Sequence, residues 1–241
     1  SIQSDAPWLV ISSSKGSIRH SKRIQLRADW TKAPVGKSEA HLSIKGPEDQ
    51  IATVTAPLEN FIPQKFRGFA ETNGYVSIQA DHFSKAVQEG AVHWKVIPGI
   101  GKNGNGMHTG PVTAPSVAAG KGPFLEYPVW ISDTGHLSVS VRCSPTLGFN
   151  RDTLRYAISF DDGAPQTINI LADHSNKKWM QWVADNINIS SSMHEINKPG
   201  AHVLKYWMVD PGIVVQQITI DCGGLQETYL GPPETRVFPS F

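Results

Sequence analysis

The stretch that decides the fold is residues 197–224, which read NKPGAHVLKYWMVDPGIVVQQITIDCGG. Pro-Gly pairs at 199–200 and 211–212 precede two runs that are rich in β-branched and aromatic residues. Proline and glycine supply the backbone angles that tight turns need, and such runs between turns are typical of strands. The stretch therefore predicts two consecutive β-strands, 202–209 and 213–222.

Upstream of this stretch, turn residues again separate segments in which apolar and polar residues alternate with the period of a strand. An Asp-Gly step at 162–163 between two alternating runs predicts a hairpin. Residues 99–123, rich in glycine and proline, predict a long ordered loop, and no segment has the caps and apolar turns of a helix. The predicted strands, which together suit a jelly roll, are 75–81, 93–98, 136–143, 154–160, 166–171, 179–189, 202–209 and 213–222.

The first part of the chain shows shorter strands at the regular spacing of an immunoglobulin-like or fibronectin-like domain. Gly36 and Gly46 lie where turns are needed, and the segment 57–67 is expected to join two domains. The sequence thus predicts an all-β chain. It comprises a small immunoglobulin-like sandwich over 1–70, a jelly-roll β-sandwich over 71–235 and a tail over 236–241.

Charge and composition exclude several classes of function. The chain has 241 residues and a net charge of +1, which gives no electrostatic reason to expect nucleic acid or an anionic membrane as a partner. No apolar run is long enough to span a bilayer, and the first residues do not resemble a signal peptide. We therefore expect neither nucleic acid nor membrane as a partner.

The two cysteines, Cys143 and Cys222, share strand parity with apolar neighbours and are expected to point into a core. They are either two buried free thiols or one disulfide of a secreted chain.

No motif announces a complete active site. Residues 99–104 fit the G-x-G-x-x-G spacing, but a dinucleotide fingerprint needs a helix after it, and the residues that follow cannot sustain one. There is no G-x-S-x-G nucleophile elbow and no closely spaced histidine pair for a metal. Catalysis by this chain alone is the least favoured reading.

Aromatic residues carry the binding prediction, because a flat ring can cover the C–H face of a sugar. Trp179 and Trp182 lie beside Lys177 and Lys178, and they predict either a partly exposed aromatic surface or a face packed against another domain. In a strand these two tryptophans would point to opposite faces. The remaining candidates are two further rings, Trp94 and Trp130, and the amide donor Asn103, whereas Trp207 is expected in the core.

Four segments carry a family resemblance: 94–101, 161–166, 202–212 and 229–234. With them, residues 72–235 resemble the C-terminal domain of glycoside hydrolase family 115, the xylan α-1,2-glucuronidases. The resemblance implies a β-sandwich at the end of a multidomain enzyme whose catalytic residues lie upstream, in a barrel. This chain is too short to contain that barrel and shows no β-α alternation.

Residues 79–81, Gln-Ala-Asp, are similar to the strand that opens carbohydrate-binding modules of families 6 and 35. In those modules this strand, with a late acidic residue, holds a structural calcium. The resemblance implies a calcium site at Gln79, Asp81 and Asp221, although glutamine lowers the charge of such a site. An ordinary strand edge is the alternative.

These observations favour a non-catalytic carbohydrate-binding module for plant cell-wall xylan or glucuronoxylan, a hemicellulose. It would be accessory to a family 115 glucuronidase, secreted or periplasmic, with a plant polysaccharide and the catalytic domain as partners. The alternative is a structural domain that docks on the catalytic part and supports its active site or dimer.

Overall fold

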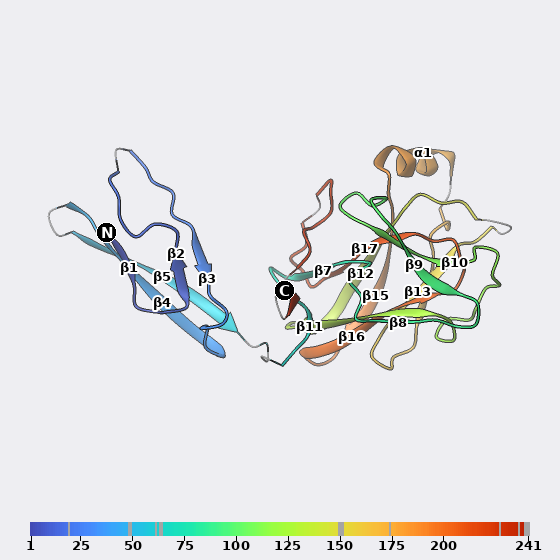
Figure 1. Cartoon of the computed structure of the whole chain (residues 1–241), viewed down its shortest axis with the longest axis horizontal. Coiled ribbons are helices and arrows are strands. Elements are labelled where there is room, and N and C mark those ends of the chain that lie inside the picture. Colours follow the sequence, from blue (N-terminus) through green and yellow to red (C-terminus); the bar gives the residue numbers. More distant parts are fainter. Residues whose placement is uncertain are drawn as a thin grey trace. The chain divides into compact units, whose positions relative to one another are not determined.

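The computed structural model describes residues 1–235 apart from positions 19, 48–49, 61, 63–64, 149–151, 174 and 227. Beyond these it describes the backbone of Val237–Phe238. The chain divides into two compact units, Ser1–Lys65 and Phe66–Phe241 (Figure 1). The other positions of the predicted tail, 236 and 239–241, lie outside the described residues.

The first unit is built on a long hairpin. Its β4 (Gly36–Lys45) and β5 (Ile51–Asn60) pair over ten residues each. β1 (Ile2–Ser4) joins β4, and a separate pair is formed by β2 (Leu9–Ile11) and β3 (Leu26–Ala28). The buried cluster of this unit is small and comprises Trp8, Ala40 and Leu58.

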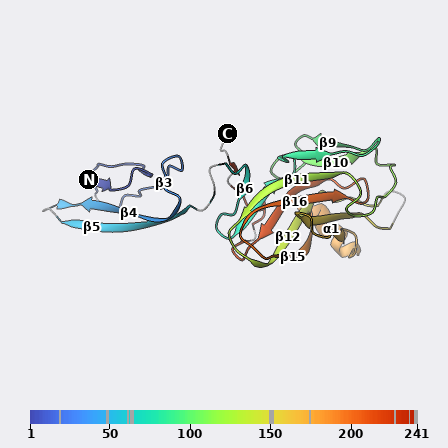
Figure 2. The same ribbon diagram turned by 90° about the horizontal axis from the view of Figure 1, so that it is seen from below.

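The second unit contains two larger sheets. The six-stranded sheet runs β15-β12-β17-β10-β9 with β7 on β17, and the seven-stranded sheet runs β14-β13-β16-β11-β6-β18 with β8 on β11. Figure 2 shows β11 beside β16 and β12 beside β15. The strand bounds are Gly68–Ala70 (β6), Tyr75–Gln79 (β7), Lys85–Val87 (β8), His93–Ile97 (β9), Gly106–Gly110 (β10), Phe124–Ile131 (β11), Gly135–Cys143 (β12), Arg155–Phe160 (β13), Gln166–Asn169 (β14), Asn188–Ile196 (β15), Gly200–Met208 (β16), Val215–Asp221 (β17) and Val237–Phe238 (β18).

The core of this unit lies between the sheets and follows the strand period. On β11 every second residue is completely buried, from Leu125 to Ile131, while the residues between them are partly exposed. Ile218 and Ile220 of β17 contribute from the other sheet. Because successive side chains of a strand point to opposite faces, this alternation aims one face of each sheet at the core.

The prediction of an all-β chain of two sandwiches is confirmed, and so is the hairpin at Asp162-Gly163, which joins β13 to β14. Two local predictions are wrong. The expected loop 99–123 contains β10, which pairs with β9 and β17. The expected strand 179–189 is instead the helix α1 (Asn176–Asp185) followed by the start of β15.

The helix forms because its ends are capped. The Ser175 side chain accepts a hydrogen bond from the backbone N–H of Lys178, and Asn186 ends the helix in the left-handed conformation. Its interior contains good helix formers and lacks proline and glycine. Within the described residues, no helix is long and apolar enough to span a membrane.

Both cysteines are free thiols, so the disulfide alternative is wrong. Cys143 is completely buried, and burial raises the pKa of its thiol to about 12. Cys222 is partly buried, and burial together with the Glu71 carboxylate raises the pKa of its thiol. Neither thiol is therefore activated as a nucleophile near neutral pH.

Candidate functional site

Helix α1 brings the two favoured tryptophans together. Trp179 and Trp182 lie one helical turn apart, and their ring centroids are 6.5 Å apart in an edge-to-face arrangement. The prediction that they point to opposite faces is therefore wrong, because it assumed a strand. Trp182 packs against the core, whereas Trp179 is partly exposed beside the exposed Lys178 and Lys177.

Two other candidate rings are held by the fold. Trp94 on β9 packs against the core, lies edge-on to Tyr206 at 6.0 Å, and donates its indole N–H to the Val87 carbonyl at 3.1 Å. Trp130 on β11 is partly exposed and lies edge-on to Phe66 at 5.6 Å. Trp94, Trp130 and Trp179 thus belong to three different elements, β9, β11 and α1.

Asn103 fastens the C-terminal part of the chain. Its amide donates to the carbonyl of Leu230, and the neighbouring Lys102 ammonium donates to the carbonyl of Tyr229 at 3.1 Å. That ammonium also lies 3.9 Å from the centroid of the Tyr229 ring, which is a cation–π contact. Asn103 thus has a structural partner in a position where the sequence predicted a sugar contact.

Residues 228–235, which we call the strap, cross the outer face of β7 and β17. Both the Gln217 amide, at 2.8 Å, and the Ser77 hydroxyl, at 3.2 Å, donate to the Pro232 carbonyl. Thr235 donates its N–H to the Ser77 carbonyl at 3.0 Å. These bonds satisfy polar groups that the strap buries, since Ser77 and Gln217 are almost inaccessible.

The three residues of the expected calcium site do not converge. Gln79 pairs with Gln217 at one end of β7, whereas Asp221 pairs with Tyr75 at the other end. Four residues of strand separate these positions by about 13 Å, and calcium ligands lie about 2.3–2.6 Å from the ion. As a set, these residues do not fit one ion.

The two carboxylates of that set already have partners. Asp81 accepts from the Asn105 amide at 2.7 Å, and Asp221 accepts from the N–H groups of Gly223 and Leu225 at 2.8 and 3.1 Å. Among the described residues, no group of three or more His, Cys, Asp or Glu side chains is placed to hold a metal. A structural calcium in this chain stays a prediction.

The sequence reasoning missed an aromatic pair on the outer face of the seven-stranded sheet. Phe124 of β11 faces Trp207 of β16, with ring centroids 4.3 Å apart, and the Trp207 indole donates to the Ser159 hydroxyl at 2.9 Å. Both rings are partly exposed, so the expectation of a core Trp207 is wrong. Strand parity was the available signal, because Trp207 alternates with the buried Tyr206 and Met208.

An ion pair between a buried carboxylate and a partly exposed guanidinium closes the turn between β16 and β17. Asp210 is almost inaccessible and accepts from the Arg155 guanidinium at 2.9 and 3.1 Å and from the Ser116 hydroxyl at 2.6 Å. These contacts raise the pKa of Arg155, chiefly through the hydrogen bond to Asp210. The paired carboxylate is committed to structure, which leaves it unsuited to act as a general acid or base.

The second unit is thus a two-sheet β-sandwich whose aromatic side chains are spread over several surfaces. Residues 68–234 match the family model of the glycosyl hydrolase family 115 C-terminal domain, which is more than half of the chain. The chain belongs to this family.

Solved structures resemble the chain in fold. A family 115 4-O-methyl-α-glucuronidase with specificity for decorated arabinogalactans matches at 17% identity and a TM-score of 0.44, over 57% of this chain and 17% of that one. A family 6 carbohydrate-binding module from Zobellia galactanivorans LamC matches at 14% identity and a TM-score of 0.41, over 61% of this chain and 98% of that one. A family 35 carbohydrate-binding module from Clostridium thermocellum matches at 12% identity and a TM-score of 0.42, over 60% of this chain and 97% of that one. No curated protein matches the chain.

Proposed function

We propose that this chain is a non-catalytic carbohydrate-binding domain for plant cell-wall xylan or glucuronoxylan and that it serves a family 115 glucuronidase. The observation that carries the proposal is the partly exposed Trp179 ring on α1, beside Lys177 and Lys178. Membership of the family supplies the context, because the family contains glucuronidases. The parent enzyme would act where plant-wall polysaccharide is found, and so would be secreted or periplasmic.

In the proposed binding mode, an aromatic ring contacts the sugar face and lysine ammonium groups contact a sugar carboxylate. The Trp179 ring covers the C–H face of a xylose unit, and Trp182 supports that ring edge-on from the core side. Lys178 and Lys177, both exposed, would pair with the carboxylate of a glucuronate branch. Binding would be weak and salt-dependent, since exposed ion pairs are screened by the solvent.

Affinity electrophoresis against a panel of soluble hemicelluloses tests this proposal. Trp179→Ala should weaken retention in glucuronoxylan roughly tenfold, which corresponds to the loss of one stacking ring at about 1–2 kcal/mol. Trp207→Ala is the matched control, because it removes a partly exposed tryptophan from a different surface.

The outcomes separate the surfaces. Loss of retention with Trp207→Ala but not with Trp179→Ala would move the binding surface to the outer sheet face. A parent chain that ignores every hemicellulose would instead favour docking.

Docking on the catalytic part is the second candidate, and one observation favours it. On the same helix, Met180 is 70% exposed and Val183, three residues later on the same side, is 53% exposed, so α1 presents two neighbouring apolar side chains to solvent. In this alternative α1 would pack on the upstream enzyme. Met180→Glu should then weaken co-purification of this chain with the catalytic part expressed separately, while Trp179→Ala leaves hemicellulose retention unchanged.

A further inference from the structure

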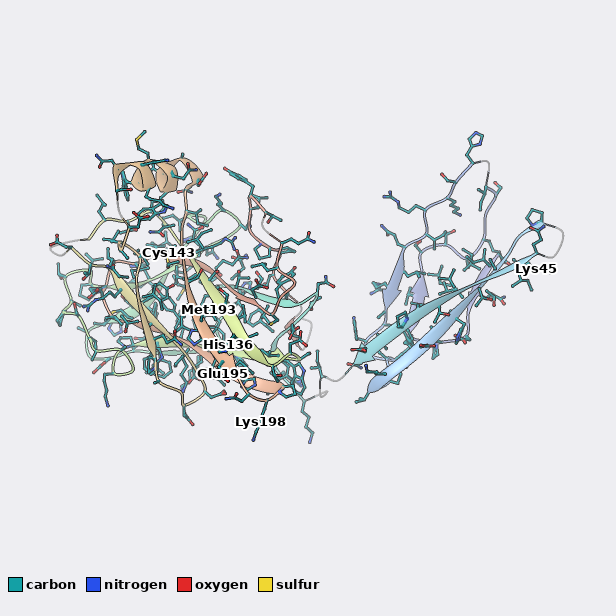
Figure 3. The ribbon with its side chains drawn as sticks, turned by 180° about the vertical axis from the view of Figure 1, so that it is seen from behind. Lys45, His136, Cys143, Met193, Glu195 and Lys198 are labelled. Carbon is teal, nitrogen blue, oxygen red and sulfur yellow. The ribbon has the colours of Figure 1, made fainter. Side chains whose placement is uncertain are left out.

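The first unit contains a cavity that nothing in the family match covers, because the match begins at residue 68. The cavity holds about 590 Å³ and is lined by three lysines from separate segments, Lys15, Lys22 and Lys45. Figure 3 marks Lys45 at the end of β4. Among the described residues, the lining contains serine hydroxyls and isoleucines and no carboxylate.

One of the three ammonium groups is held in place by the chain. Lys22 Nζ donates to the Ser13 hydroxyl at 2.9 Å and to the Lys15 carbonyl at 3.1 Å. An ammonium has three N–H donors, so these two contacts leave one for a ligand. Gly16 makes the arrangement possible, because a Cβ at that position would lie 2.4 Å from Lys22 Nζ.

Two other lysines of this unit, Lys32 and Lys37, are neutralised in a way that Lys15 and Lys22 are not. Lys32 pairs with Asp29 and Lys37 pairs with Glu59, each at 2.9 Å. Lys15 and Lys22 make no ion pair with any carboxylate that the structure describes. The positive charges of Lys15 and Lys22 therefore lie together at one cavity and are left for an anion.

We propose that this cavity binds the carboxylate of an acidic sugar. Lys15 and Lys22 would bind the carboxylate. The Ser13 and Ser17 hydroxyls would bind ring hydroxyls, and Ile24 and Ile44 would cover a C–H face. The volume is in the range of small-ligand sites, which admits one or two sugar units and exceeds the need of a lone inorganic anion. This site is independent of Trp179, because it lies in the other unit.

Competitive acetylation of lysines in the full chain tests the proposal without a mutation. The probes are xylotetraose bearing one glucuronate, unsubstituted xylotetraose and inorganic phosphate, and the readout is acetylation at each lysine by mass spectrometry. The acidic oligosaccharide should slow acetylation of Lys15 and Lys22 several-fold, while the neutral one leaves these lysines unchanged. Lys32 and Lys37 report general effects of added ligand.

Binding measurements on variants complete the test. Lys15→Gln/Lys22→Gln should lower affinity for the acidic oligosaccharide about tenfold, the size expected for a lost charge-assisted contact. Lys32→Gln/Lys37→Gln has the same charge change and should bind like the parent. Equal loss in both double variants, protection by phosphate alone, or no protection by any probe would each overturn the assignment.

The result is also separable from the function proposed above. Trp179→Ala should leave the protection of Lys15 and Lys22 intact while retention in glucuronoxylan weakens. Conversely, protection of Lys15 and Lys22 together with unchanged retention of Trp179→Ala would support the cavity while contradicting the Trp179 surface.

Discussion

Gly231 shows how one residue controls the fit of the strap. Its φ is +83°, and a Cβ there would lie 2.6 Å from Gln217 Oε1 and 3.2 Å from Arg142 Cζ. Both the backbone conformation and the lack of space therefore favour glycine at this position.

Gly231→Ala should lower the free energy of unfolding by about 2 kcal/mol, through φ strain and displacement of Gln217. Gly212→Ala is the control, since Gly212 has a φ of +101° and no atom within 4 Å of its Cβ position. Urea unfolding of both variants separates the two causes. Equal destabilisation would show that the contact with Gln217 contributes nothing.

His194 links the stability of the second unit to pH. It is buried on β15, where its Nε2 lies 2.8 Å from the Ser192 hydroxyl, and burial lowers the pKa of its imidazole from 6.5. The folded state thus disfavours protonation of His194, while the unfolded state binds a proton at the ordinary pKa.

The stabilisation from neutral His194 is present above about pH 6.5 and is lost as the pH falls through the folded-state pKa. Unfolding free energies at pH 7.5 and 5.5 should therefore fall less in His194→Gln than in the parent. The same loss on acidification in both proteins would assign the pH dependence to other groups.

At the scale of elements, the sequence predicts the main strands of the second unit well and the helix between them poorly. Period-two alternation located β7, β12, β13, β16 and β17, because burial of one face enforces that period. It failed at α1, where tryptophans and lysines of a surface helix have no strong apolar stripe and only Ser175 and Asn186 mark its ends.

The candidate site was harder to predict for a related reason. The tryptophans were recognisable as residues, but their grouping depends on elements that periodicity assigned wrongly. The three residues expected to hold calcium were grouped without knowledge of strand register, and the register places Gln79 and Asp221 at opposite ends of the β7–β17 pair.

Ser175 should control whether α1 forms. Ser175→Ala removes the acceptor for the Lys178 N–H and should cost about 1 kcal/mol, while Ser175→Thr retains the cap. Hydrogen exchange of the Lys178 and Trp179 amides should accelerate in the alanine variant alone. Unchanged exchange would mean that Trp182, packed on the core, holds the helix by itself.

At the scale of the whole molecule, the two units differ in how much they bury. The first has a cluster of three buried residues, whereas the second has a continuous cluster drawn from both sheets. Because burial of apolar surface is the main source of stability, the first unit should be the weaker.

Unfolding in urea should therefore show two steps, with peptides of residues 1–65 losing protection from hydrogen exchange at lower urea than peptides of 66–235. Mass spectrometry of exchanged peptides at increasing urea measures this directly. Simultaneous loss in both units would show that they unfold as one cooperative body.

The contacts of the strap determine where a truncated form of this protein can end. The family match ends at residue 234, yet the next residue, Thr235, makes three hydrogen bonds with the Ser77 backbone, at 3.0, 3.2 and 3.3 Å. A fragment cut at the edge of the match would deprive the N–H and the C=O of Ser77 of these partners. The smallest piece worth expressing therefore reaches at least Phe238, because β18 pairs with β6 beyond Thr235, and a boundary drawn from similarity alone falls short of both contacts.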